Sequence, residues 1–318
     1  MRIASVRMVV AAALTVTHGA CADPAPCSGF DAHRVIGSLG DPRLKEVSGL
    51  VLSRKNRDVF WVHKDSGDSA RLFALAKTGR VLAEVSLPGI TATDWEDVEL
   101  GPGPRRRREY LYAADIGNNC ECRGVLTIHR FPEPVIKPGK REAALKASGI
   151  ESFSFRYADR PNDGYNAEAL LVDPRTGHVY VVTKQDGPRA GLYEVPLMGE
   201  SGTPAVASRV GELLLDIPGP ANDSFRITAG DVSASGDTIV LITYTHGFLW
   251  RRASGESIPQ ALARPPCALP RMRGAGPEAV ALDREGRRTY TVTEGVGSLL
   301  YTIGPSSGGE RASAKRSR

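Results

Sequence analysis

An acidic residue followed by small and apolar residues, a turn and two β-rich runs recurs five times along this chain. The runs are bounded by Gly, Asp, Asn or Pro, which is typical of strands joined by tight turns. The acids are Glu46, Asp97, Glu168, Asp231 and Glu278, at intervals of 51, 71, 63 and 47 residues. Such intervals suit radially repeated four-stranded sheets with loop insertions. The pattern predicts an all-β β-propeller with five blades, or six if a longer interval hides one. An antiparallel sandwich is the alternative, but it does not require the same acid at the head of the same strand five times.

The ends of the repeat array indicate how the ring closes. A fourth, outer strand is readable at 81–87, 151–156 and 210–215, but the last repeat runs out of chain before its own. Residues 34–39 precede the first acid, and we expect them to supply the missing strand. The predicted single domain spans residues 23–304.

The first 22 residues are predicted to be an export signal. Arg2 and Arg7 precede an apolar run at 8–16 and then small residues, the order of a secretory signal. The run is too short to span a membrane, and no later stretch approaches that length. Cleavage after Ala22 would release a periplasmic or extracellular protein. Gly19-Ala20-Cys21 also resembles the end of a bacterial lipobox, which would make Cys21 the lipid anchor of an outer-membrane lipoprotein.

The net charge of +5 is concentrated at the two ends of the chain. Residues 1–22 carry +2, and residues 305–318, predicted to be a disordered basic tail, carry +3, which leaves zero for the body. A neutral body has no basic footprint for phosphate backbones. We therefore expect no nucleic-acid partner, and we expect a monomer. The run Arg105–Arg108, between Gly and Pro residues, is interpreted as a solvated turn.

Four further cysteines allow three disulfide pairings. One C-x-C without a second pair or a nearby His is not a zinc site. In an oxidising compartment, we favour a local Cys120–Cys122 bridge and a Cys27–Cys267 bridge that staples the ring closure.

Propeller geometry predicts a site at one mouth of the central channel. Within a blade, the start of the first strand and the end of the second lie at the same end, and the first strand is innermost. The second strands end at Asp65, Asp115, Lys184, Tyr244 and Glu294, so eight of the ten aligned positions are acidic. Crowded carboxylates must protonate, pair with cations or bind a metal, and their oxygens suit Ca²⁺ or Mg²⁺. Two alternatives stay open: acids that only cap strand ends, and a site for a cationic ligand without metal.

Several of these segments also carry a family resemblance. The segments are Trp95-Glu-Asp97, Asp115-Ile-Gly-Asn-Asn119, Asn166-Ala-Glu-Ala169, Thr228-Ala-Gly-Asp-Val232 and Pro277-Glu-Ala279 with Glu294-Gly295. Together they resemble a family of exported, uncharacterised bacterial β-propellers with W-E-D, D-I-G-D-N, D-A-E-A and S-E-G elements, over residues 40–303. Asn118 and Asn166 stand where that family has Asp, which removes charge. The more distant similarity to phytase-like and esterase-like propellers implies a calcium-dependent hydrolase.

The sequence therefore predicts a divalent-cation site that binds a small anionic or ester ligand, in a hydrolase. The predicted metal ligands are Asp65, Asp97, Asp115, Glu168, Asp231, Glu278 and Glu294. Among the catalytic candidates, His63 beside Asp65 would act as a base, Lys184 would orient the anion and Glu168 would be a ligand or a base. The chain has no G-x-S-x-G elbow, H-E-x-x-H motif or Gly-rich phosphate loop. A non-catalytic binding or scaffold propeller of the cell envelope is the alternative.

Overall fold

The computed structural model describes residues 24–30, 33–137, 139, 142–197, 202–215, 224–272, 276–293, 295 and 297–305. The predicted signal at 1–22 with Cys21, nearly all of the predicted basic tail, and Glu294 lie outside these ranges. Within them, no helix has the length and apolar character needed to cross a membrane.

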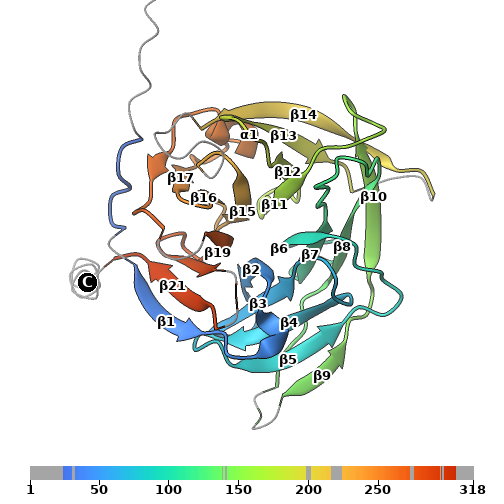
Figure 1. The fold of residues 1–318 in the computed structure, drawn as a ribbon, viewed down its shortest axis with the longest axis vertical. Helices are drawn as coiled ribbons and strands as arrows, with labels where there is room; N and C mark the ends of the chain where they lie inside the picture. The colour runs from blue at the N-terminus through green and yellow to red at the C-terminus, as the bar shows by residue number, and fades with distance from the viewer. Residues whose placement is uncertain are drawn as a thin grey trace, which may run out of the picture.

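The described chain is almost entirely β, arranged around a centre (Figure 1). The first sheet contains β2 (Val47–Leu52), β3 (Val59–Lys64), β4 (Arg71–Ala76), β5 (Val81–Ser86) and β9 (Ala143–Lys146). An eight-stranded sheet contains β6 (Trp95–Pro102), β7 (Glu109–Asp115), β8 (Leu126–Pro132), β10 (Glu151–Tyr157), β11 (Ala167–Val172), β12 (Val179–Thr183), β13 (Arg189–Val195) and β14 (Ala205–Leu214). A third sheet contains β15 (Ile227–Val232), β16 (Thr238–Thr243), β17 (Gly247–Arg251) and β18 (Cys267–Ala268). The last contains β19 (Pro277–Leu282), β20 (Thr289–Thr293), β21 (Leu299–Ile303) and β1 (Arg34–Ser38).

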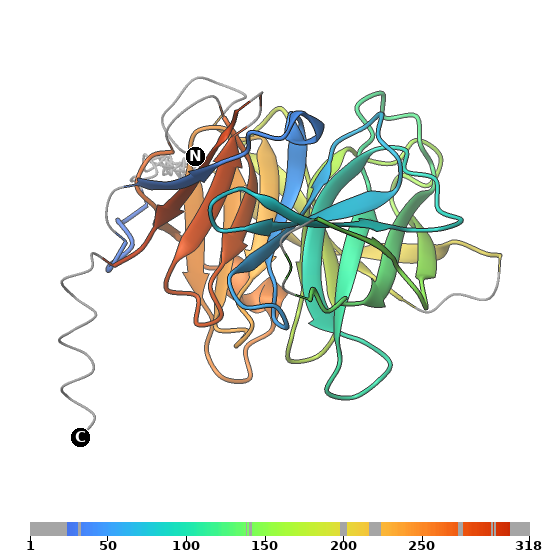
Figure 2. The same cartoon turned by 90° about the horizontal axis from the view of Figure 1, so that it is seen from below.

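Neighbouring strands within these sheets pair antiparallel, with two parallel exceptions. β10 pairs with β14, which joins two four-strand halves into the eight-stranded sheet, and β5 pairs with β9. The innermost strands are β2, β6, β11, β15 and β19, which surround the centre (Figure 1). Seen from the side, the strands run between the two faces of the ring (Figure 2). The arrangement is propeller-like, as the repeat predicts.

Apolar side chains fill the spaces between neighbouring sheets. Because alternate residues of a strand face opposite sides, each inner strand contributes to two such spaces. In β11, Leu170 packs in the cluster shared with β7, whereas Leu171 packs in the cluster shared with β15–β17. All six residues of β11 are buried. The continuous apolar runs of the sequence therefore correspond to strands that are covered on both faces.

The N-terminal segment closes the ring. β1 pairs antiparallel with β21, with Arg34 opposite Thr302, so the prediction for residues 34–39 is confirmed. Just before it, Cys27 is bonded to Cys267 in β18. The segment is therefore tied to one sheet by the disulfide and to the next by backbone pairing. The predicted Cys120–Cys122 bond is also present.

Three elements differ from the prediction. β9 adds to the edge of a sheet formed some sixty residues earlier in the chain, a nonlocal parallel pairing that local patterns do not encode. β18 is an outer strand that the sequence did not predict, and it has only two residues. The short helix α1 (Ile258–Leu262) is too short for periodicity to reveal, although Ser257 and Gln260 form a capping box before it. Apart from these three elements, a short 3₁₀ turn, η1 (Pro42–Leu44), leads from β1 toward β2.

Candidate functional site

A β-bulge lies at the second residue of every inner strand. The strand-to-strand register shifts at Ser48, Glu96, Glu168, Thr228 and Glu278. A bulge adds one residue and re-aims its side chain. These five residues are therefore the equivalent positions of the repeat. The alignment by acids matches them only at Glu168 and Glu278; it is displaced in the other three repeats, where it selects Glu46, Asp97 and Asp231.

Three carboxylates converge at the mouth. Asp65 follows β3, Asp94 precedes β6, and Glu96 is the bulged residue of β6. One oxygen of each lies within 4.8 Å of the others. Glu96 is buried, and Ser48 donates its hydroxyl to Glu96 at 3.3 Å. The first two acids are half-buried, so the cluster opens toward solvent from a buried base.

The loop that carries Asp94 is held by Asp115, one of the predicted metal ligands. Its carboxylate accepts the backbone N–H groups of Thr93 at 2.9 Å and Asp94 at 3.1 Å. It also accepts Nη2 of Arg123 at 2.6 Å. Both oxygens are therefore used within the protein, and Asp115 positions the cluster from outside it.

Gly117 forms one wall of the cluster. An added Cβ would lie 2.2 Å from Oε1 of Glu96 and 2.4 Å from Oδ2 of Asp94. A side chain at this position would push the two carboxylates aside, so glycine lets the backbone approach them in the observed arrangement. Its N–H donates to the carbonyl of Asp94 at 3.0 Å, which fixes the approach.

Lys184 binds the fourth acid of the mouth, Glu168. The ammonium donates to the Glu168 carboxylate and, at 2.7 Å, to the hydroxyl of Tyr244. The side chains of Lys184 and Glu168 are 13% and 8% exposed, respectively. The prediction placed Lys184, Glu168 and Tyr244 at the same mouth, and the structure brings them together.

The mouth acids destabilise one another's charged forms. Burial and then Asp65 raise the pKa of Asp94 to about 6. Burial, followed by Glu168 and Asp65, raises the pKa of Glu96 well above its usual range. Burial raises the pKa of Glu168 to about 7, although Lys184 opposes the shift. Nearby cations therefore do not fully offset the cost of holding these described acids in their charged forms.

One residue further along β6, Asp97 connects the inner strands. Its Oδ2 accepts the N–H of Leu170 at 2.9 Å and of Gly230 at 3.3 Å, and Oδ1 accepts the N–H of Val98 at 2.9 Å. Asp97 is fully buried, and burial raises its pKa well above the ordinary value. This predicted metal ligand therefore accepts hydrogen bonds from the backbone of neighbouring strands. Its role is close to the alternative in which the acids cap strand ends and bind no metal.

Asp231 has a similar structural setting. It accepts the N–H of Leu282 at 2.5 Å and a hydrogen bond from the carboxyl of Glu99. Glu99 in turn accepts the N–H of Val232 at 3.1 Å. Burial raises the pKa of Asp231 to about 6 and that of Glu99 well above its usual range. The sequence analysis did not single out Glu99.

His63, the predicted base, is fully buried between β2 and Trp95. Its Nδ1 bonds to the carbonyl of Lys64 at 2.8 Å, and its ring packs edge-on against Trp95. An added Cβ on Gly49 would lie 2.2 Å from Nε2 of His63, so β2 covers the ring closely. Burial lowers the pKa of His63, which favours the neutral ring. The structure thus places His63 away from solvent, in a packing position.

The remaining predicted residues lie at the rim. Glu278 is half-buried, and its charge acts on Tyr244. Glu46 is paired with Lys64 at 3.8 Å, with its side chain 47% exposed. Glu294 lies outside the described residues.

The two asparagines that replace acids of the resembled family connect loops. Oδ1 of Asn166 accepts the N–H of Asn118 at 2.7 Å, and Nδ2 of Asn118 donates to the carbonyl of Asp163 at 2.8 Å. Oδ1 of Asn118 accepts the N–H of Arg123 at 2.9 Å. Ionised aspartate at 118 could not make the donated bond, so the amide is required here.

A polar cavity of about 690 Å³ opens beside Lys184. Its lining includes Asn119, Tyr165, Asn166, Lys184, Arg226 and Tyr244. Two ion pairs flank it, Arg160 with Glu121 at 2.7 Å and Arg226 with Asp186 at 2.5 Å. Lys184 links the cavity to the acids of the mouth, because it lines the cavity and pairs with Glu168.

Asp94 and Glu96 were visible in the sequence only as parts of an acidic segment. A small residue follows the bulge in four inner strands, at Gly49, Ala169, Ala229 and Ala279. In β6 the residue after the bulge is Asp97, so this pattern does not identify Glu96.

Comparisons with known proteins leave the family open. No protein-family model matches the sequence, and no curated protein matches it. Among solved structures, the calcium structure of a Trichoderma reesei carbohydrate-active enzyme of family AA12 is 10% identical, with a TM-score of 0.42, covering 89% of this chain and 97% of that chain. A gluconolactonase from Xanthomonas campestris is 11% identical, with a TM-score of 0.43, covering 89% and 96%. Likenesses of this size assign no activity to this chain.

Proposed function

We propose that this chain is an exported five-bladed β-propeller whose mouth binds a divalent cation, Ca²⁺ or Mg²⁺, and that it hydrolyses small ester or phosphate substrates. The eight-stranded sheet then counts as two blades joined through β10 and β14. The two disulfides fit an oxidising compartment. Cleavage of the predicted signal would leave the protein in the periplasm or outside the cell, unless Cys21 carries a lipid.

The observation that carries the proposal is the uncompensated charge of Asp65, Asp94 and Glu96. Within the described part of the chain, none of the three has an ion pair with Lys or Arg. The nearest cations are engaged elsewhere, Lys184 by Glu168 and Arg123 by Asp115. One of these carboxylates is buried and two are half-buried, and at this spacing they need a counter-charge to stay ionised together. A divalent cation would supply it.

The donor set fits a hard cation. Ca²⁺ takes carboxylate oxygens at about 2.3–2.6 Å, so that ligands on opposite sides of the ion lie roughly 5 Å apart. The three oxygens lie within 4.8 Å of one another, and Gly117 leaves the space next to Asp94 and Glu96. We therefore assign the cation to Asp65, Asp94 and Glu96, with Glu168 beside them, in place of the larger set predicted from sequence.

The chain's own residues suit hydrolysis of a polar substrate in the adjacent cavity. When bound, the cation would polarise a substrate oxygen and lower the pKa of water. Lys184, fixed by Glu168 and Tyr244, presents a positive charge to an anionic group. Glu168 lies beside the proposed cation, where its carboxylate is held by Lys184, and it is our candidate base.

Calorimetric titration of the protein with Ca²⁺ and Mg²⁺ tests the cation site. We expect saturable binding that Glu96→Gln and Gly117→Ala each weaken at least about tenfold, because the first removes a charge and the second crowds the cluster. The matched control is Glu46→Gln, which removes an acid at the same mouth outside the cluster. Absence of binding by the unmodified protein, or equal losses in all three variants, contradicts the proposal.

A non-catalytic binding propeller is the second candidate. It is favoured by Asp97 and Asp231, whose carboxylates hold neighbouring strands through backbone amides. Turnover separates the two functions. A cation-dependent hydrolysis of ester or phosphate substrates that Glu168→Gln abolishes supports the enzyme, whereas cation binding without turnover in a broad substrate screen supports the binding module.

A further inference from the structure

Positive charge gathers on the face of the ring opposite the mouth. Each inner strand begins at the mouth and leads, at its other end, into a hairpin to the next strand. The hairpins comprise residues 53–58, 103–108, 173–178, 233–237 and 283–288, and they contain eleven Lys or Arg and five Asp or Glu. Inner strands of six to eight residues separate this hairpin face from the mouth by roughly 20–26 Å. The charge of the net-neutral body is therefore unevenly distributed, with an acidic cluster at the mouth and an excess of Lys and Arg on the hairpin face.

The hairpins form one continuous surface. Arg284 donates to the carbonyl of Arg54 at 3.1 Å, and Arg54 pairs with Glu109 at 2.9 Å. Arg175 donates to the carbonyl of Ser235 at 3.3 Å, and the N–H of Ser235 donates to the carbonyl of Arg284 at 3.3 Å. Contacts of this kind between neighbouring hairpins indicate a surface built as a unit.

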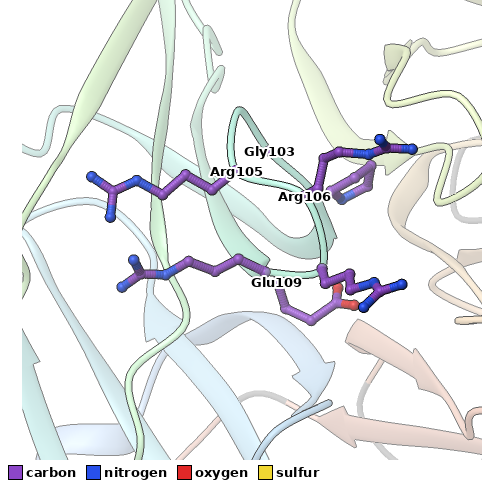
Figure 3. A pocket seen from close by; sticks show the side chains of 7 residues that line it. Gly103, Arg105, Arg106 and Glu109 are labelled. Carbon is purple, nitrogen blue, oxygen red and sulfur yellow. The ribbon is translucent and has the colours of Figure 1, made fainter.

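The arginines of the 103–108 hairpin are unneutralised. Arg105, Arg106 and Arg107 are exposed, and the described part of the chain offers none of them an ion pair. Arg105 and Arg106 extend to opposite sides of the loop (Figure 3). Hollows of about 530 and 470 Å³ adjoin the loop. These guanidinium groups are therefore free to meet an anion from outside.

An exposed apolar side chain lies on the same face. Val135 follows β8 and is 65% exposed. Its segment is fixed to the first hairpin by Asn56, which accepts the N–H of Ile136 at 2.7 Å and donates to the carbonyl of Pro134 at 2.9 Å. Cations around an exposed apolar residue are typical of surfaces that lie on membranes.

We propose that the hairpin face docks on an anionic lipid surface, with the mouth turned away from the membrane. The charge is complementary to phosphate headgroups, and Val135 can enter the interfacial region. The five hairpins contain no Phe, Tyr or Trp on which unpaired bases could stack, which favours lipid over single-stranded nucleic acid. Predicted export places the chain beside such a surface. The proposal is independent of cation binding at the mouth.

Co-sedimentation of the protein with vesicles tests this. The probes are phosphatidylcholine vesicles with and without about one third phosphatidylglycerol. We expect binding only to the anionic vesicles, and we expect salt to weaken it. Each arginine near an anionic membrane strengthens binding about fivefold, so replacing Arg105, Arg106 and Arg107 together by Gln should weaken it about a hundredfold.

The matched control replaces three exposed cations away from the hairpin face by Gln: Lys45 before β2, Lys146 in β9 and Arg156 in β10. It makes the same change in net charge away from the hairpin face, and we expect a loss of less than about fivefold. Unchanged melting temperature shows that each variant is folded. Absence of binding to anionic vesicles, or equal losses in the two triple variants, overturns the proposal. So does arginine-dependent binding of duplex DNA without binding to vesicles, because the partner would then be nucleic acid.

Discussion

Replacing Lys184 by Met tests how the mouth tolerates its acids. The side chains of Lys184 and Glu168 are 13% and 8% exposed, so the change leaves a buried carboxylate near Asp65 and Asp94 without its cation. Removing one partner of a buried ion pair destabilises a protein by about 3–5 kcal/mol. Each kcal/mol lowers the melting temperature of a domain of this size by roughly 2–4 °C. We therefore expect a fall of roughly 6–20 °C near neutral pH.

The loss should depend on pH in a defined direction. Burial raises the pKa of Glu168 to about 7 while Lys184 opposes that shift, so removal of Lys184 raises the pKa further. A carboxyl whose pKa is raised by folding keeps its proton in the folded state, and stability falls as pH rises from the unfolded pKa through the folded one. The variant should therefore lose most stability near pH 8 and least near pH 5, where Glu168 is protonated. Melting followed by circular dichroism at both pH values measures this.

A second lysine supplies the control. Lys64 ends β3 at the mouth, but its partner Glu46 is 3.8 Å away and 47% exposed. Lys64 is itself 12% exposed, but its removal leaves Glu46 in solvent and not buried. Pairs with an exposed partner contribute about 0–1 kcal/mol, so Lys64→Met should lower the melting temperature by a few degrees at most. Adding Glu168→Gln to Lys184→Met should restore most of the loss. Equal losses for the two lysine variants, or a Lys184→Met loss that does not change with pH, would refute the reasoning.

Two further predictions concern the buried acids between the inner strands and the crosslinks. Burial raises the pKa of Asp231 to about 6, so urea unfolding should show stability falling between about pH 4 and pH 6, a slope that Asp231→Asn flattens; an unchanged slope in the variant contradicts this. Replacing Cys27 and Cys267 by Ser, which opens a crosslink between residues 240 apart in sequence, should cost about 5 kcal/mol. The same change at Cys120 and Cys122, only 2 apart, should cost much less, and equal melting temperatures for the two double variants would count against loop closure as the cause.

Most of the fold could be predicted because its signals are local. Alternating and apolar runs bounded by turn residues locate strands such as β3 and β16, and their recurrence indicates radial repetition. The closing strand β1 could be predicted because the last repeat lacks a fourth strand. β9 could not, since its partner β5 is far away in sequence and their parallel pairing depends on the path of the intervening chain.

Some residues of the candidate site were predicted to share one end of the ring, but the composition of its acid cluster was not predicted. Lys184, Glu168 and Asp65 meet at the predicted mouth. Asp97 follows Glu96 directly, yet the two have different surroundings, because the bulge re-aims Glu96 and leaves Asp97 among backbone amides. A change of one residue in register moves a side chain to another face, and acid spacing alone does not reveal it.

The amino-acid sequence by itself determined the strand-rich repeat, the closing strand, the pairing of cysteines and the end of the ring where acids collect, because each depends on residue type and order along the chain. Only the tertiary structure decided which acids share a cluster and which hold strands together. It also decided that the net-neutral body separates its charges onto two faces. Burial, register and the contacts between distant hairpins produce these features, and they exist only once the ring has closed.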